Sequence, residues 1–524
     1  MRNGNSLKAL ATLLVLAVLL AALPATQAAE AVPSLHFQVR EFLVEGENPL
    51  SPEQTRAVLD IFLGEHEGLE GLVEAAAELE SAMVGAGHSF HRVILPPQTL
   101  GGDQVRLQVI VLKLANIEIT GNKYFSSDNI LASLPGLAPG TPPDTRTLAR
   151  AIQVANEHPA KKLMLRLKES DAPDGIDAEI AVTDRRPWQA YSMLNNIGTD
   201  ETGDYRLSAG FQHGNLLNRD DTLTLSYTTS PDHLEEVQQY GINYRFPIYA
   251  LAGDLSLFYS HSDVDSGVVA QVFEVSGAGD FFGAQFRHTL PNLGGYRHRF
   301  MAGLESRYFE NNISFSGAPI GIDVRTVPFT VQYSGDYAFE RARVAFYLGY
   351  LHNLPAGDRN NDTVYAAARA GAARDWEALR YGASLIVSLP RKWSLNVDWI
   401  GQYAAEPLVA GEQFGLGGTD SIRGFDERVL TGDSGNRVRL GIWTPQWRES
   451  IRLVGFLDAG HADLEQPVAG QRDSDTLVSL GVGLRWQWRE HANVSLDYGH
   501  EIDDLRGIPA EDGEKLHISL LLRY

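Results

Sequence analysis

From Trp188 to Tyr524 the chain alternates apolar and polar residues in short segments, and this alternation limits the possible folds more than any other feature. Successive side chains of an extended strand point to opposite faces, so Leu223, Leu225 and Tyr227 of the stretch DTLTLSYTT share one face. The hydroxyl side chains between them share the other face. The end of the chain repeats the scheme with Leu516, Ile518, Leu520, Leu522 and Tyr524. Outward-facing apolar residues over segments of about ten residues are typical of a transmembrane β-barrel.

We count sixteen such strands in this part of the chain, with short turns such as Arg391–Lys392 alternating with long polar loops. A soluble β-sandwich or propeller would also explain the alternation. Such a fold would not explain three further features together. These are the Trp and Tyr residues at the strand flanks, the aromatic C-terminal residue and the N-terminal segment described next. No run of 18 or more apolar residues follows that segment, so a closed barrel is the fold by which this chain would cross a bilayer.

The first 28 residues predict a bacterial secretory signal peptide. Arg2 and Lys8 precede the apolar run from Ala9 to Leu23, and small residues that suit cleavage after about Ala28 follow it. An N-terminal membrane anchor is the alternative, but the apolar run is shorter than the roughly 20 residues that a helical span needs.

Composition and motifs exclude several classes of function. The formal net charge of -22 argues against nucleic-acid binding, which needs a basic face. The chain has no cysteine, hence no disulfide framework and no thiolate chemistry. It also has no G-x-S-x-G, H-E-x-x-H or glycine-rich phosphate motif, so we expect neither enzymatic activity nor a cofactor. His500, Glu501, Asp503 and Asp504 could suggest a cation site, but we interpret them as a solvated loop between the last two strands and predict no metal.

Before the barrel segment, strands and helices alternate twice in the same order. Each pass predicts a β-α-α-β-β unit, the first over residues 35–113 and the second over residues 114–186. In the first unit the stretch LHFQVREFLVEG predicts one strand, and Ser51, Pro52 and Gln54 predict a helix start with a capping box. The second unit ends with two predicted strands, around residues 161–168 and 177–182.

A long polar stretch, about residues 404–436, separates the eleventh predicted strand from the twelfth. It contains Gly417, Gly418, Ile422, Arg423, Gly424 and Phe425. The next predicted strand contains Phe456, Asp458 and Gly460. Alternation along IRLVGFLDAG turns Leu453 and Leu457 toward lipid and Asp458 into the lumen, where a carboxylate attracts a cationic partner.

In this order and on these elements, the two units, the barrel and both motifs resemble the two-partner secretion transporters of the hemolysin secretion/activation family. In that family the β-α-α-β-β units are called POTRA domains, and the likeness covers nearly the whole mature chain. It implies an α+β fold of two periplasmic POTRA domains, 35–113 and 114–186, followed by a 16-stranded antiparallel transmembrane β-barrel over 188–524. It also implies that the long loop folds back into the lumen and that Arg423 pairs with Asp458. A planar guanidinium suits this role because it can donate two hydrogen bonds to one carboxylate.

The resemblance further implies the function of a Gram-negative outer-membrane transporter. Such a transporter captures an unfolded, large, secreted β-helical partner protein in the periplasm and passes it to the cell surface without hydrolysing nucleotide. We expect capture by β-augmentation at the strands around 161–168 or 177–182, a monomer surrounded by outer-membrane lipid, and recognition of Tyr524 by the outer-membrane assembly machinery. The alternative is an insertase of the same superfamily, which assembles other outer-membrane proteins.

One feature departs from the family pattern. Many members carry a helix of about twenty residues before the first POTRA domain, and this helix plugs the barrel. Cleavage near Ala28 leaves only the stretch AEAVPSL before the first predicted strand. We therefore expect no plug helix, and we expect the loop that carries Arg423 to occlude most of the lumen.

Overall fold

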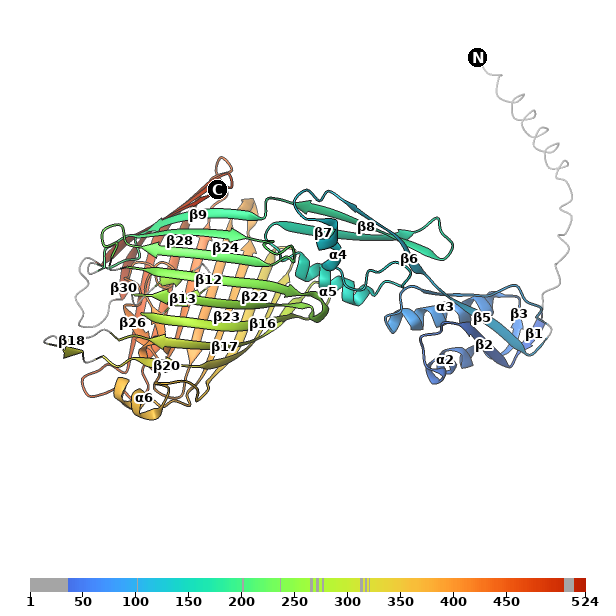
Figure 1. The fold of residues 1–524 in the computed structure, drawn as a ribbon, viewed down its shortest axis with the longest axis horizontal. Coiled ribbons are helices and arrows are strands. Elements are labelled where there is room, and N and C mark those ends of the chain that lie inside the picture. The colour runs from blue at the N-terminus through green and yellow to red at the C-terminus, as the bar shows by residue number, and fades with distance from the viewer. Residues whose placement is uncertain are drawn as a thin grey trace, which may run out of the picture. The chain divides into compact units, whose positions relative to one another are not determined.

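The computed structural model describes residues 36–524, except 101, 200–201, 236, 264–266, 270–272, 276–277, 312–313, 316–317, 320 and 504–512. The predicted signal peptide and the predicted short segment before the first strand lie outside the described residues. None of the helices in the described ranges is long and apolar enough to cross a bilayer. The chain divides into two compact units, one ending at Leu112 and the other spanning Lys113–Tyr524 (Figure 1).

The first unit packs two helices on a three-stranded sheet in the order β2-β5-β4. Its elements are β1 (His36–Val39), β2 (Glu41–Gly46), α2 (Pro52–Leu59), η1 (Asp60–Phe62), β3 (Gly64–Glu67), α3 (Glu70–Gly85), β4 (His91–Ile94) and β5 (Gln104–Val111). The predicted capping box is confirmed, because the Ser51 side chain accepts from the Gln54 N–H while the Gln54 side chain accepts from the Ser51 N–H. The single strand predicted at the start is wrong. The chain breaks there into β1, which pairs with the unpredicted β3, and β2, which pairs in parallel with β5.

Helix α3 forms the core of this unit. Leu72, Leu79 and Met83 recur at helical spacing and are fully buried. Leu79 and Met83 pack with Leu107 of the central strand. Each such side chain contributes about 1.5–3 kcal/mol by leaving water.

The second unit begins with a smaller domain, whose sheet has the order β6-β8-β7. Its elements are β6 (Lys113–Thr120), α4 (Ser127–Ala132), α5 (Thr145–Ala155), β7 (Lys161–Glu169) and β8 (Gly175–Asp184). Strand β8 pairs with β6 on one side and with β7 on the other. The stretch 177–182, expected to be a candidate capture edge, is therefore the centre of the sheet. Among the residues that the structure describes, the free edges belong to β6 and β7.

The barrel that follows is closed and antiparallel (Figure 1). Within the described residues it has sixteen strands. They are β9 (Trp188–Asn195), β10 (Arg206–His213), β11 (Thr222–Thr229), β12 (Gln239–Ile248), β13 (Gly253–Ser262), β16 (Gly279–Thr289), β17 (Arg297–Phe309), β20 (Val324–Thr326) continued by β21 (Pro328–Ala338), β22 (Ala342–Asn353), β23 (Glu377–Ser388), β24 (Ser394–Tyr403), β27 (Ser434–Trp443), β28 (Ile451–Asp463), β29 (Ser474–Trp488), β30 (Ala492–Asp503) and β31 (Glu514–Arg523). Both β20 and β21 pair with β17 in one register, so they form one strand. Strand β31 pairs with β9 and closes the cylinder. The predicted barrel and strand count are confirmed.

The loops between these strands carry short elements of their own. They are η2 (Tyr249–Leu251), β14 (Gly267–Val269), β15 (Phe273–Val275), β18 (Ser314–Phe315), β19 (Ala318–Pro319), α6 (Asp362–Ala368), η3 (Pro390–Lys392), η4 (Ala410–Glu412), β25 (Phe414–Leu416) and β26 (Leu430–Gly432).

Burial along the strands follows the predicted alternation. Leu225 and Tyr227 are exposed on the outer face, whereas Thr224 and Thr228 of the same strand are buried. One expectation about this region is wrong. His500 belongs to strand β30 rather than to a loop, because the polar residues at the end of this strand resemble loop residues in sequence.

Candidate functional site

Residues 404–433, which connect β24 to β27, form the lumen loop. Its root, 404–416 and 430–433, contains η4 and the hairpin β25-β26, in which Leu416 pairs with Leu430. Its tip, residues 417–429, contacts the inner wall of the barrel through the interactions described next. The eleventh and twelfth barrel strands therefore flank the loop, as the sequence predicts.

An ion pair joins the loop tip to strand β28. The Arg423 Nε donates to Asp458 Oδ2 at 2.7 Å, and Nη2 donates to Oδ1 at 2.9 Å. The Arg423 backbone N–H also donates to Asp458 Oδ2, at 3.3 Å. Only 5 % of the Arg423 side chain and none of the Asp458 side chain is exposed. The pair is therefore bidentate and desolvated, which is the geometry in which a guanidinium and a carboxylate hold each other most specifically.

Phe456 also binds the Arg423 guanidinium, through its aromatic ring. The Arg423 Cζ lies 3.6 Å from the centroid of the Phe456 ring, a close cation–π contact. The ring lies against Gly481 of β29, where a Cβ would come within 2.3 Å of it. Phe456 and Asp458 thus bind the same side chain from one face of β28, one by the ring and one by the carboxylate.

Further charges surround the pair on the barrel wall. Arg423 Nη1 lies 3.5 Å from Asp497 Oδ1, and Asp497 also accepts two hydrogen bonds from Arg485, at 2.9 and 2.6 Å. Arg439 Nε lies 3.9 Å from Asp458 Oδ2. Three cations and two carboxylates alternate in this cluster, so each carboxylate has two cationic neighbours.

Gly424 lets the loop backbone touch the wall. Its φ is +98°, a conformation that favours glycine, and its N–H donates to Nε2 of His517 on β31 at 3.0 Å. A Cβ on Gly499 of β30 would lie 2.7 Å from the Gly424 backbone. Two glycines facing each other across the contact therefore allow a separation that no other residue pair permits.

The remaining motif residues turn the chain at the start of the tip and pack it against the barrel wall. Gly417 and Gly418 have φ of +105° and +98°, which turns the chain at the end of β25. Ile422 is fully buried and packs with Phe425 and Leu416. A Cβ on Gly460 of β28 would lie 2.8 Å from the Leu416 side chain, so Gly460 makes room for this apolar seat.

The loop root is held by two buried carboxylates. Glu412 Oε2 accepts from Arg307 at 2.6 Å and from Arg380 at 3.3 Å, and its Oε1 accepts from Thr326 at 2.7 Å. Asp433 Oδ2 accepts from Arg369 at 2.6 Å. Neither carboxylate side chain is exposed.

Backbone groups and an apolar core add to this root. The Leu408 and Glu465 N–H groups donate to Asp433 at 2.9 and 2.8 Å. Leu408 also packs in a buried core with Tyr365 of α6 and Trp376, which belong to the loop between β22 and β23. The loop root is therefore attached to several strands and to a second loop.

A cavity of about 670 Å³ remains beside the loop. Loop residues such as Phe414 and Arg428 line one side, and wall residues such as Phe258 and Phe281 line the other. The loop tip binds β28 to β31, so this cavity separates it from the wall of β13 and β16.

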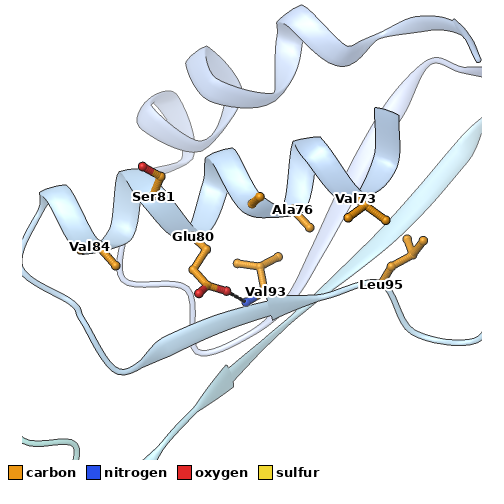
Figure 2. A pocket seen from close by; sticks show the side chains of 8 residues that line it. Val73, Ala76, Glu80, Ser81, Val84, Val93 and Leu95 are labelled. Carbon is orange, nitrogen blue, oxygen red and sulfur yellow. Dashed lines mark hydrogen bonds between the residues drawn. The ribbon is translucent and has the colours of Figure 1, made fainter. Parts of the chain in front are cut away.

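A second hollow lies in the first unit, between α3 and the edge strand β4 (Figure 2). Its volume is about 470 Å³, and its lining is Val73, Ala76, Ala77, Glu80, Ser81, Val84, Val93 and Leu95. Glu80 Oε2 accepts the Val93 N–H at 3.0 Å, so this backbone donor of β4 is bound by a side chain (Figure 2). Within the described residues β4 pairs with β5 alone, which leaves one edge of it open beside an apolar hollow.

The structure thus brings together all the motif residues named from the loop and from β28. Tyr524 lies elsewhere, with 70 % of its surface exposed and its N–H donating to Ala190 of β9 at 2.9 Å. Sequence reasoning missed the roles of His517, Gly499 and the two root carboxylates. Inward-facing glycines and ionisable residues on the last strands are the signal that could have identified the wall partners.

Comparison with known proteins gives a consistent result. Residues 174–486 match the model of the haemolysin secretion/activation protein family ShlB/FhaC/HecB, and residues 37–111 match the ShlB-type POTRA domain. The heme/hemopexin transporter protein HuxB of Haemophilus influenzae is 21 % identical over 486 residues, covering 89 % of this chain and 83 % of its own. The outer membrane transporter CdiB of Escherichia coli is 20 % identical over 472 residues, covering 86 % and 76 %.

Solved structures share the fold. CdiB from Escherichia coli has a TM-score of 0.71 at 17 % identity and covers 96 % of this chain and 93 % of its own. CdiB from Acinetobacter baumannii has a TM-score of 0.66 at 18 % identity, with coverage of 94 % and 90 %. BamA from Haemophilus ducreyi lacking POTRA domains 1–3 has a TM-score of 0.52 at 13 % identity, with coverage of 93 % and 100 %.

Proposed function

The chain belongs to the haemolysin secretion/activation family and is an outer-membrane transporter of two-partner secretion, and from this premise we propose that its lumen loop controls the path of the secreted client. Family members are transporters that act with a secreted partner protein, and their POTRA domains are periplasmic. The predicted function is favoured over the insertase alternative, because the family match covers most of the barrel whereas the likeness to BamA is one of fold.

The observation that carries the proposal is the desolvated Arg423–Asp458 pair. A buried ion pair contributes little net stability compared with apolar residues, because removing both charges from water offsets their attraction. Removing one partner costs about 3–5 kcal/mol, because the other charge is then left unpaired. The pair therefore determines where the loop tip lies more than how stable the barrel is.

Six loop residues and three wall residues act together in this proposal. Gly417, Gly418, Ile422, Arg423, Gly424 and Phe425 place the loop tip, and Phe456, Asp458 and Gly460 receive it. The client shares the lumen with this loop. A remaining cavity of about 670 Å³ is far smaller than a folded domain, so the client passes as an extended chain.

We infer that capture precedes this step and uses open strand edges in the periplasm. An extended client segment displaces the Glu80 carboxylate from the Val93 N–H and adds to this edge of β4, and its apolar side chains enter the adjacent hollow beside α3 (Figure 2). The edge of β7 is a second candidate. The client is large and β-helical, the transporter is a monomer in outer-membrane lipid, and Tyr524 is read by the assembly machinery.

Replacing Arg423 tests the proposal. Arg423→Ala leaves Asp458 facing only its more distant cations, so the loop tip loses its position and client secretion falls by about tenfold or more. Arg472→Ala is the matched control, since Arg472 is 40 % exposed and belongs to a surface pair with Asp475. Secreted client is measured against the amount of heat-modifiable barrel in outer-membrane fractions. Unchanged secretion by Arg423→Ala at normal barrel abundance would overturn the proposal.

A further inference from the structure

A buried lysine lies where the second POTRA domain meets the barrel. Lys161 is the first residue of β7, and none of its side chain is exposed. Its Nζ donates to both oxygens of Asp220 at 2.6 Å, to Ser133 Oγ at 2.9 Å and to Asn129 Oδ1 at 3.0 Å. All the donors of this ammonium are thus directed at protein oxygens.

Asp220 belongs to the barrel, in the turn between β10 and β11. Its carboxylate also accepts from Ser133 at 2.7 Å and from the Tyr249 hydroxyl at 2.5 Å. Tyr249 lies in η2, the turn between β12 and β13. Burial alone would raise the pKa of Asp220, but the Lys161 ammonium and these hydrogen bonds lower the pKa below its ordinary value. The carboxylate therefore stays ionised and joins two barrel turns to two residues of the POTRA domain, Lys161 and Ser133.

A second contact lies beside this cluster. The Nε2 of His158 hydrogen-bonds to the Gly214 carbonyl of the barrel, and its Nδ1 accepts the Ala160 N–H at 3.1 Å. Burial lowers the pKa of His158 to about 4, so its ring is neutral near pH 7 and donates one N–H to that carbonyl. Glu157 lies 3.0 Å from Arg299 of β17, which adds an ion pair between the same two parts.

We propose that the Lys161–Asp220 cluster locks the second POTRA domain to the barrel, and that Lys161 is a positioning residue for transport. An orientation that buried the ammonium and the carboxylate apart would leave each without its partner, so the pair favours this docked geometry. Because Lys161 begins β7, the lock also determines where the free edge of that strand lies relative to the lumen. This last step rests on the proposed capture of the client at a POTRA strand edge.

Spin labels can measure the lock without a client. The chain has no cysteine, so Asp171→Cys and Leu293→Cys introduce two unique sites. Both residues are exposed, one in the β7-β8 turn and one in the β16-β17 turn of the barrel. The distance between nitroxides at these sites is recorded by pulsed electron paramagnetic resonance on the full chain in lipid.

Lys161→Met should widen this distance distribution at least about twofold and lower client secretion about tenfold at unchanged barrel abundance. Lys123→Met is the matched control, because Lys123 is an exposed lysine of the same domain in the loop between β6 and α4, away from the β7 edge, and it should change neither readout. If Lys161→Met fails to give a folded barrel, Lys161→Met with Asp220→Leu removes both charges and should give the same wide distribution.

The two readouts separate the parts of the inference. A distribution that stays narrow in the Lys161 variants would overturn the lock, whatever secretion does. A wide distribution with normal secretion would overturn the positioning role and leave the proposed control by the lumen loop unaffected. A wide distribution with reduced secretion supports the lock and the positioning role together.

Discussion

The tip and the root of the lumen loop are held by opposite arrangements of charge. At the tip the loop supplies the cation, Arg423, and the wall supplies the carboxylate, Asp458. At the root the loop supplies the carboxylates, Glu412 and Asp433. The arginines there come from the surrounding structure and are Arg307, Arg369 and Arg380.

The two ends are also held by different parts of the barrel. The loop tip depends mainly on the Arg423 pair, the Phe456 ring and the Gly424 contact, all from the wall of β28 to β31. The root is bound to β17, β20 and β23 and shares a buried core with the loop that contains Trp376. Because tip and root bind different parts of the barrel, we expect that the tip can leave its wall while the root stays attached, so that a moving loop would pivot at its root.

Removing the root carboxylate Asp433 should have the largest effect on the barrel. Asp433→Ala leaves Arg369 unpaired and two backbone N–H groups without their acceptor, at a cost of about 3–5 kcal/mol. Barrel abundance and the temperature of unfolding, followed by heat modifiability in gels, should both fall. Normal stability of the Asp433→Ala barrel would show that contacts other than those of Asp433 hold the loop root.

Neutralising Glu412 should have a smaller effect. Glu412→Gln keeps an acceptor for Thr326 but removes the charge that faces Arg307 and Arg380, at a cost of about 1.5–3 kcal/mol. The loss is limited because Arg307 retains Glu305 at 2.8 Å. The same unfolding measurement checks this prediction. A larger loss of stability in Glu412→Gln than in Asp433→Ala would contradict the predicted ranking of the two variants.

Gly424→Ala probes the close approach at the tip. The new Cβ would lie 3.2 Å from the Gly499 backbone at a φ of +98°, which costs about 1–3 kcal/mol in the docked state. Secretion should fall while barrel stability changes little. Gly455→Ala is the control, because a Cβ there meets only Ile442, at 3.5 Å. Equal secretion by the two variants would contradict the close contact.

We expect the smallest effect on secretion from replacing the Phe456 ring. Phe456→Leu keeps an apolar side chain under Arg423 but removes the ring, at a cost of about 1–2 kcal/mol. Secretion should fall less than in Arg423→Ala. A loss as large as that of Arg423→Ala would mean that the ring, rather than the carboxylate, positions the tip.

The barrel was predictable because apolar and polar side chains must alternate along a strand that faces lipid on one side. This period of two is visible in single segments such as 222–229. The strand order of the smaller domain that contains β6, β7 and β8 was not predictable, because the pairing of β8 with both β6 and β7 depends on contacts far apart in sequence. The partners of the loop tip were partly hidden for the same reason. His517 lies 93 residues from Gly424, and only its inward-facing position on the last strand marks it as a possible partner.

The most direct test of the account is a double-mutant cycle on Arg423 and Asp458, with client secretion per folded barrel as the measurement. If the two residues act as one interaction, Arg423→Ala and Asp458→Ala should give similar defects. The double variant should then be no worse than the more defective single variant. Strictly additive defects would contradict the claim that this pair positions the loop for transport.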